Sequence, residues 1–118
     1  MKRIKTCKPI FLSFFLILLV AGFCQAGACK ATYGNGEPTF KLATGSPGEL
    51  GLLKELAEAF NAQHNTSMCW VKAGSGKSLK LLQSKAVDLV MVHAPAAEKK
   101  AVEDGWAIKR TLIGSNEF

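Results

Sequence analysis

The residues with the clearest chemical potential in this 118-residue sequence are Gly74, Ser75 and Gly76, which Lys77 follows. The glycines leave backbone N–H groups uncovered, the serine adds a hydroxyl, and a helical pattern opens at Lys77. A helix N-terminus of this composition directs hydrogen-bond donors and positive potential at one point, which suits the binding of an anion. Taken alone, however, the loop fits an ordinary strand-to-helix turn better, with Lys77 in solvent.

A second loop of similar chemistry strengthens the anion-binding hypothesis. Thr44, Gly45 and Ser46 also follow a strand-like stretch and precede a helical pattern. Two hydroxyl-bearing loops at one edge of a sheet are harder to explain as coincidence than one. His93 follows a third apolar stretch and could face the same cleft, although a structural hydrogen bond at the end of its strand is the simpler interpretation.

Enzymatic chemistry finds little support in the sequence. Gly76, Lys77 and Ser78 resemble the end of the phosphate-binding motif GxxxxGK[ST], but that motif requires glycine where Val71 stands. The spacing indicates no Ser–His–Asp set, no paired carboxylates and no cysteine–histidine cluster. We therefore predict a binding protein that is not an enzyme, with no metal site and no cofactor.

Alternating strands and helices are expected to position these loops. Strands are predicted at 40–44, 67–71, 88–92 and 106–113, with helices from Glu49, from Lys77 and over 96–104. The apolar run 88–92 is typical of a strand buried on both faces, and the charged side chains of 96–104, Glu98 included, are expected in solvent. The order predicts an α/β fold with a mostly parallel sheet and helices on both faces. In such sheets, ligands bind beyond the carboxyl ends of the strands, where both loops lie.

The N-terminus has the pattern of a secretory signal peptide. Four basic residues precede the apolar run 10–23, and small residues follow at 26–28. The run is too short to span a bilayer comfortably. We predict a signal peptide over residues 1–28 and a periplasmic destination, with membrane contact only through this segment or a lipid anchor.

The remaining chain divides into a leader and a domain. Residues 29–38, rich in turn-forming types, are expected to form a flexible leader, and 39–118 a single domain. Cleavage before Gly27 and cleavage before Cys29 are both plausible. The second would resemble a bacterial lipoprotein with its lipid on Cys29, but Ala26 stands where such proteins usually have leucine.

Removal of the signal peptide changes the arguments from charge and from cysteine. Four of the 15 basic residues and none of the nine acidic residues lie within it, so the rest carries a formal charge of only +2 and gives no reason to expect a nucleic-acid partner. Of the four cysteines, Cys29 and Cys69 remain. They either form a disulfide in an oxidising compartment or stay free, as a tail residue and a buried strand residue.

Several segments together resemble the periplasmic tungstate-binding proteins of ABC transporters. Residues 42–46 and 51–53 correspond to the family's LATTTST segment and the GLL that follows it, and residues 71–79 to its VGTGxAL. Residues 88–98 correspond to DADVxLVHxPxAE, 105–110 to GYGxxR and 115–118 to YNDF. The resemblance covers nearly the whole chain from Phe40 onward, and the Val-His-x-Pro-x-Ala-Glu region is its most specific part.

The resemblance implies the first lobe of a type II periplasmic-binding-protein-like fold. It also implies that hydroxyls and loop amides bind tungstate or molybdate for an ABC transporter permease. Carried over by position, Thr44, Ser46, Gly74, Ser75 and Gly76 are the ligand candidates, which the loop chemistry supplements with Lys77 and His93 as supporting residues.

The sequence also departs from the family pattern. The first loop is one residue shorter and has Gly45 and Pro47 where threonine is usual, and Ala86 replaces a common acidic residue. The family's chain continues into a second lobe, so we expect a truncated first lobe here. Phosphate or sulfate binding, and an exported remnant that binds nothing, are the alternatives.

Overall fold

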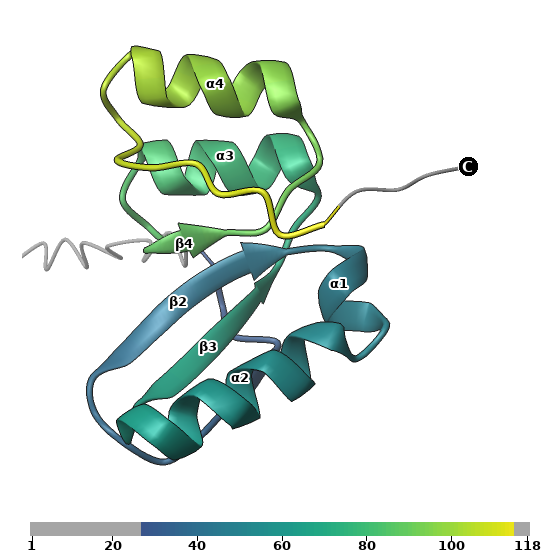
Figure 1. Ribbon diagram of the computed structural model, residues 1–118, viewed down its shortest axis with the longest axis vertical. Helices are drawn as coiled ribbons and strands as arrows, with labels where there is room; N and C mark the ends of the chain where they lie inside the picture. Colours follow the sequence, from purple (N-terminus) through teal and green to yellow (C-terminus); the bar gives the residue numbers. More distant parts are fainter. Residues whose placement is uncertain (1–26, 115–118) are drawn as a thin grey trace, which may run out of the picture.

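The computed structural model describes residues 27–114 and shows a small α/β structure (Figure 1). Most of the predicted signal peptide, residues 1–26, and the segment 115–118 lie outside the described residues. None of the described helices is long and apolar enough to cross a membrane. In chain order the elements are β1 (Ala31–Tyr33), β2 (Thr39–Thr44), α1 (Ser46–Glu49), α2 (Leu52–His64), β3 (Ser67–Lys72), α3 (Ser75–Gln83), β4 (Leu89–Val90) and α4 (Pro95–Glu103).

The four strands form one mostly parallel sheet in the order β1-β3-β2-β4. The central strand β2 runs parallel to both β3 and β4, and β1 is antiparallel to β3. The predicted α/β class with a mostly parallel sheet is therefore confirmed. Because Thr44 pairs with Lys72 at the ends of β2 and β3, the loops that follow these strands leave the sheet at the same edge.

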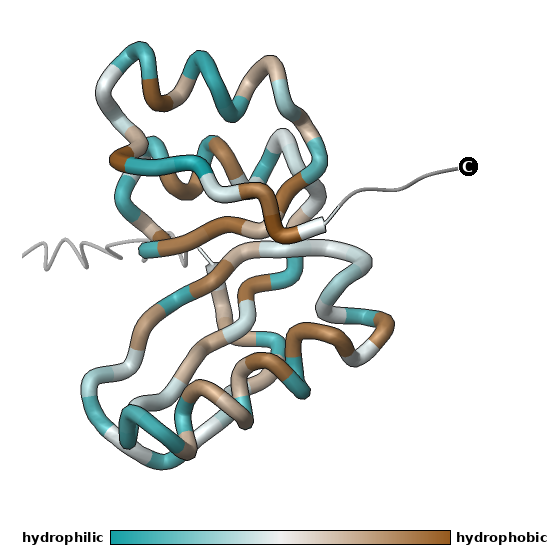
Figure 2. The backbone as a smooth tube through the Cα atoms, viewed as in Figure 1, coloured by the Kyte–Doolittle hydropathy of each residue, from teal (hydrophilic) through white to brown (hydrophobic). Residues whose placement is uncertain are grey.

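Alternation along the strands divides the core into two layers. Leu42 and Trp70 point to one face and pack with Leu53 and Ala57 of α2. Neighbouring strand residues point to the other face, where they pack with Leu81 of α3. Helices thus cover both faces, as the sequence predicted, and α2 and α3 lie on opposite sides of the strands (Figure 1). In Figure 2, β4 is largely hydrophobic and much of α4 is hydrophilic, whereas α2 carries hydrophobic residues that include the exposed Leu52, Leu56 and Phe60.

The predicted flexible leader is the first point that the structure corrects. Its residues 31–33 form β1, which pairs with 68–70 of β3. The N–H of Lys30 also donates to the carbonyl of Trp70 at 2.6 Å. Glycine, asparagine and proline do place turns at 34–38, but the free edge of β3 supplied hydrogen bonds that local sequence could not reveal.

A disulfide between Cys29 and Cys69 fixes this edge. Cys29 is exposed just before β1, and Cys69 is buried in the middle of β3. Their Cα atoms lie 5.3 Å apart. The structure thus selects the disulfide from the two alternatives that the sequence left open.

The far side of the sheet is less complete than predicted. β4 has two residues instead of five, and the side chain of Leu89 is 50% exposed, so the expected burial on both faces was wrong. Residues 106–113 begin with bends at 106 and 107 and belong to no described strand, which corrects the predicted fourth strand of the α/β pattern. Both differences have one cause, because no described strand pairs with the outer edge of β4.

The segment after β2 is more regular than predicted. The first helix was expected to start at Glu49, yet Ser46–Glu49 already makes the short helix α1 with proline in its first turn. The next helix, α2, consequently begins at Leu52 instead of Glu49. Gly51 has a φ of 88° between the two helices, a conformation that glycine adopts without strain.

Candidate functional site

The loops after β2 and β3 lie against each other at the carboxyl edge of the sheet. The N–H of Ala73 donates to the carbonyl of Thr44 at 3.1 Å. A side chain at Gly45 would approach within 3.3 Å of the Ala73 carbonyl oxygen and 3.9 Å of the Gly74 Cα. The predicted convergence of the two loops is therefore present, and glycine at 45 permits their close approach.

The N-terminus of α3 presents backbone donors at this edge. Gly74 precedes the helix in an extended conformation and makes no side-chain cap. Ser78 is the first residue with an intrahelical bond, from its N–H to the Gly74 carbonyl at 2.9 Å. The N–H groups of Ser75, Gly76 and Lys77 precede it and have no acceptor within the helix. Because Gly74 and Gly76 are exposed, this cluster of donors is open to solvent.

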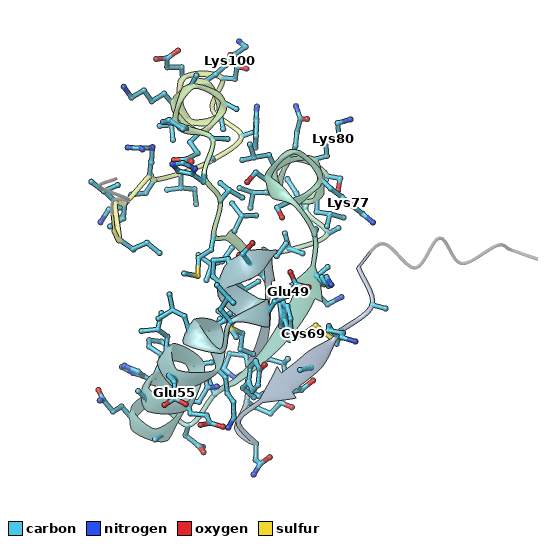
Figure 3. The ribbon with its side chains drawn as sticks, turned by 90° about the vertical axis from the view of Figure 1, so that its right-hand side faces the viewer. Glu49, Glu55, Cys69, Lys77, Lys80 and Lys100 are labelled. Atoms are coloured by element: carbon cyan, nitrogen blue, oxygen red, sulfur yellow. A yellow bond between two sulfur atoms is a disulfide. The ribbon has the colours of Figure 1, made fainter. Side chains whose placement is uncertain are left out.

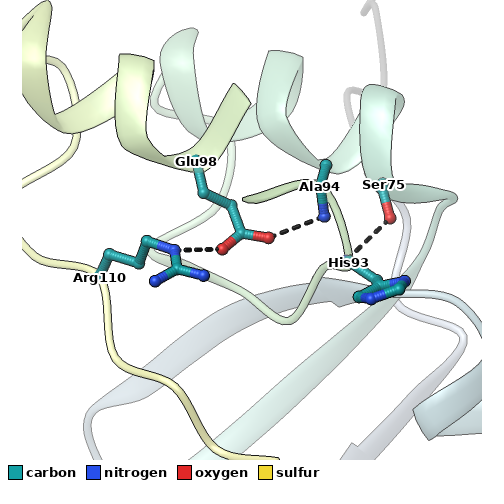
Figure 4. A network of polar contacts seen from close by, with 5 residues as sticks. All are labelled: Ser75, His93, Ala94, Glu98 and Arg110. Carbon is teal, nitrogen blue, oxygen red and sulfur yellow. Dashed lines mark hydrogen bonds and ion pairs between the residues drawn. The ribbon is translucent and has the colours of Figure 1, made fainter. Parts of the chain in front are cut away.

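Ser75 is oriented by the loop that follows β4 (Figure 4). The backbone N–H of His93 donates to Ser75 Oγ at 3.2 Å. Since the hydroxyl oxygen accepts this bond, the hydroxyl hydrogen of Ser75 is available to another acceptor. The structure thus uses His93 through its backbone, and the His93 side chain is exposed.

Thr44 is placed differently from the other candidates. It is fully buried, and its hydroxyl donates to the carbonyl of Met91 at 2.8 Å. Its own carbonyl accepts from Trp70 Nε1 at 3.0 Å. A threonine hydroxyl has a single hydrogen to donate, so in this conformation Thr44 joins the loops that surround the site and does not offer a donor to a ligand.

The remaining predicted residues lie at the surface. Ser46 is exposed at the first residue of α1, directly after the glycine that approaches the second loop. Lys77 is exposed in the first turn of α3, and Figure 3 shows it and Lys80 extending away from the helix into solvent. Glu49 of α1 forms an ion pair with Lys72 at the end of β3, which adds a charged contact beside the two loops.

Sequence reasoning missed the role of Glu98. One carboxylate oxygen accepts from the Ala94 N–H at 2.8 Å and the other pairs with Arg110 Nε at 2.6 Å (Figure 4). Burial raises the pKa of Glu98, but the Ala94 hydrogen bond and the Arg110 charge outweigh it and hold the pKa below its ordinary value. The expectation of a solvated Glu98 was wrong. Its place in the first turn after Pro95, where acidic residues favour helix starts, was the signal that could have revealed it.

The arrangement at the N-terminus of α3 can hold an anion. It combines backbone N–H groups, a serine hydroxyl and the positive end of α3 at an open edge. Across residues 27–114, no group of three or more histidine, cysteine, aspartate or glutamate side chains could hold a metal ion. The backbone N–H groups and the serine hydroxyl are hydrogen-bond donors, and they suit a ligand that only accepts hydrogen bonds.

Comparisons with known proteins found one matching family and several similar proteins. A family model described as a PBP superfamily domain matches residues 30–118. Among curated proteins, a tungstate-binding protein of Campylobacter jejuni is 32% identical over 68 residues, which are 58% of this chain and 25% of that protein. A putative ABC transporter anion-binding protein of Haloferax volcanii is 25% identical over 93 residues, or 79% of this chain and 27% of that protein.

Solved structures of tungstate-binding proteins are also similar to this chain. The tungstate-binding protein of Desulfovibrio alaskensis matches with a TM-score of 0.59 and 38% identity, over 64% of this chain and 30% of that one. A structure described as the tungstate ABC transporter of Geobacter sulfurreducens matches with a TM-score of 0.55 and 38% identity, over 60% of this chain and 31% of that one. This chain therefore spans about a quarter to a third of the length of these relatives.

Proposed function

Because this chain belongs to the PBP superfamily, we propose that it is an exported solute-binding component of an ABC transporter. Its ligand in this proposal is a tetrahedral oxyanion, tungstate or molybdate. It binds and delivers this anion and performs no catalysis. The names of the Campylobacter jejuni and Desulfovibrio alaskensis relatives support the choice of anion, and the Haloferax volcanii relative supports the broader class.

The open N-terminus of α3 is the observation that carries this proposal. Its first amides have no acceptor within the helix, and no side chain caps them. The helix end also bears partial positive charge, which favours an anion. Tungstate and molybdate are doubly charged and accept hydrogen bonds at every oxygen, so a site built from donors complements them.

Each predicted residue has a distinct part in this site. The hydroxyls of Ser75 and Ser46 donate to the anion, and the glycines Gly74 and Gly76 let its oxygens approach the backbone. Thr44 supports the site by joining its loop to the one after β4.

Two further residues act from the rim of the site. Lys77 adds positive charge without a fixed contact. His93 orients Ser75 through its backbone N–H, which leaves the serine hydrogen free for the ligand.

The location follows from the N-terminus and the disulfide. We propose export by a signal peptide within residues 1–28 and function in the periplasm, where a disulfide is stable. A thioether-linked lipid on Cys29 would need the thiol that the Cys29–Cys69 bond uses. We therefore propose that the signal peptide is cleaved before Gly27. The partner of the exported protein in this proposal is the permease of the transporter in the membrane.

Calorimetric titration of the exported, purified protein tests this function. The expected result is saturable heat with tungstate or molybdate, and weaker or no heat with sulfate and phosphate. Saturation only with phosphate or sulfate would assign the site to those anions instead. No heat with any anion, from protein that circular dichroism shows to be folded, would contradict stand-alone binding and leave the non-binding alternative.

The variant Ser75→Ala tests the site itself. Loss of one hydrogen bond to a charged ligand costs about 1.5–3 kcal/mol, so we expect the dissociation constant to rise about 10- to 150-fold. Ser84→Ala is the matched control, because Ser84 is an exposed serine at the opposite end of the same helix. Equal affinities of the two variants would refute the assignment of the site to the N-terminus of α3.

A further inference from the structure

A chain of polar contacts connects Ser75 with α4 and with the segment that follows it (Figure 4). Ser75 Oγ accepts from the His93 N–H at 3.2 Å, and the next backbone amide, that of Ala94, donates to Glu98 at 2.8 Å. The other carboxylate oxygen of Glu98 pairs with Arg110 at 2.6 Å. Since Ser75 is a proposed donor to the anion, these contacts link the anion site to side chains outside its two loops.

The loop that carries the His93 N–H is short and is held at both ends. At its start, the Met91 carbonyl accepts from the Thr44 hydroxyl at 2.8 Å. At its end, Glu98 holds the Ala94 N–H. Because the peptide unit is planar, fixing the Ala94 N–H also fixes the carbonyl of His93. The His93 N–H lies between these two anchors, so its direction toward Ser75 depends on both of them.

Glu98 is itself held in a defined orientation. Its side chain is 15% exposed and that of Arg110 is 31% exposed, so the pair is sheltered from solvent on one side. The Ala107 N–H donates to the Ala101 carbonyl at 3.0 Å, which attaches the segment that carries Arg110 to α4. With both carboxylate oxygens bonded, Glu98 can hold the loop in one position.

The charge of Glu98 separates two explanations of these contacts. A glutamate in the first turn of α4 stabilises that helix end, which is a purely structural role. A carboxylate near an anion site also repels the anion, although Arg110 offsets part of this repulsion. If the role is only structural, removal of the carboxylate should leave anion affinity unchanged or raise it. If Glu98 positions the loop, its removal should lower anion affinity.

We propose that Glu98 is a positioning residue of the anion site, which acts through Ala94 and His93 on Ser75. By holding the loop, it keeps the His93 N–H directed at Ser75 Oγ and leaves the serine hydrogen for the ligand. This inference rests on the proposed anion-binding function, and it adds a residue of α4 that lies outside both glycine-containing loops.

Calorimetric titration of the exported protein with tungstate tests the effect on affinity. Glu98→Ala should raise the dissociation constant about 2- to 30-fold, the range for residues that are coupled to a site without contacting its ligand. Glu103→Ala is the matched control, because it removes the same charge from the exposed last residue of α4. Affinity of Glu98→Ala equal to or above that of the wild type, or an equal loss in the control, would overturn the proposal.

Two further variants test the route through Ser75. Glu98→Gln retains an oxygen that can accept from the Ala94 N–H, so it should recover most of the affinity that Glu98→Ala loses. In a Ser75→Ala background, Glu98→Ala should cause no additional loss, because the group on which it acts is already absent. Additive losses, or a glutamine variant as weak as the alanine variant, would contradict this route.

Amide hydrogen exchange in the anion-free protein separates this proposal from the proposed function. In Glu98→Ala, exchange of the His93 amide should accelerate about 2- to 10-fold, as expected for a weakened hydrogen bond. The Asn65 amide, which donates to the Asn61 carbonyl at the end of α2, is the internal reference and should not change. If the wild-type protein binds no anion, the proposed function fails, whereas unchanged His93 exchange, or equal acceleration at both amides, refutes the positioning role.

Discussion

Removal of the Cys29–Cys69 disulfide should be the most damaging single change outside the core. The bond closes a loop of 40 residues in the unfolded chain. Chain-entropy arguments give a stabilisation of about 4 kcal/mol for a loop of that length. Small domains have a net stability of about 5–15 kcal/mol. The bond therefore accounts for a large share of the total.

Cys29→Ser is the cleanest perturbation. Cys29 is exposed, so its replacement creates no cavity, whereas Cys69 is 1% exposed and a serine there would bury a hydroxyl. We expect the free energy of unfolding to fall by about 4 kcal/mol in urea titrations, and the melting temperature by roughly 16–32 °C. Exchange of the Lys30 amide should also accelerate, because its bond to the Trp70 carbonyl depends on a fixed β1.

Reductant provides the control for this experiment. It should destabilise the wild-type protein to the level of the variant and leave Cys29→Ser unchanged. If the variant stays within about 1 kcal/mol of wild type, then β1 is held by its own hydrogen bonds and the reasoning from loop closure fails.

Three other substitutions test the packing around the site. Gly48→Ala should lower the free energy of unfolding by about 1–3 kcal/mol in the same urea titrations. Its Cβ would lie 2.3 Å from the ring of Trp70, and the hydrogen bond of Trp70 Nε1 holds that ring in place. An unchanged urea midpoint would contradict this packing. The pKa of Glu98 is lower in the folded protein than in the unfolded chain. Its ionised carboxylate therefore stabilises the fold above the unfolded pKa, and this stabilisation is lost as the pH falls through the folded pKa. Glu98→Gln should therefore destabilise at neutral pH and converge with wild type in acid, and a constant difference across pH would count against the pairing with Arg110. Thr44→Val should lower stability by about 1–3 kcal/mol through the unsatisfied loop carbonyl, with only an indirect effect on tungstate affinity in calorimetry; a loss of affinity as large as that of the serine variant would return Thr44 to direct ligand contact.

Local patterns in the sequence were sufficient to predict the central part of the fold. The predicted strands at 40–44 and 67–71 and the predicted helices from Glu49 and over 96–104 lie within a few residues of β2, β3, α2 and α4, and their order implied a mostly parallel sheet. The same order placed the glycine loops at one edge, where the structure brings them together. These features were accessible because they depend on interactions between near neighbours in sequence.

Long-range contacts decided the rest. β1 exists because β3 offered an edge and Cys69 a bonding partner 40 residues away. The hydrogen of the Thr44 hydroxyl is taken by a carbonyl 47 residues later, and no local pattern could show that commitment. A strand also needs a neighbour, so the strand-like pattern of 106–113 remained unpaired where none of the described residues supplied one. The sequence by itself determined which segments can be helices, strands and donor-rich loops, whereas the tertiary structure decided which of their hydrogen-bonding groups are already used and which remain available to a ligand or a partner.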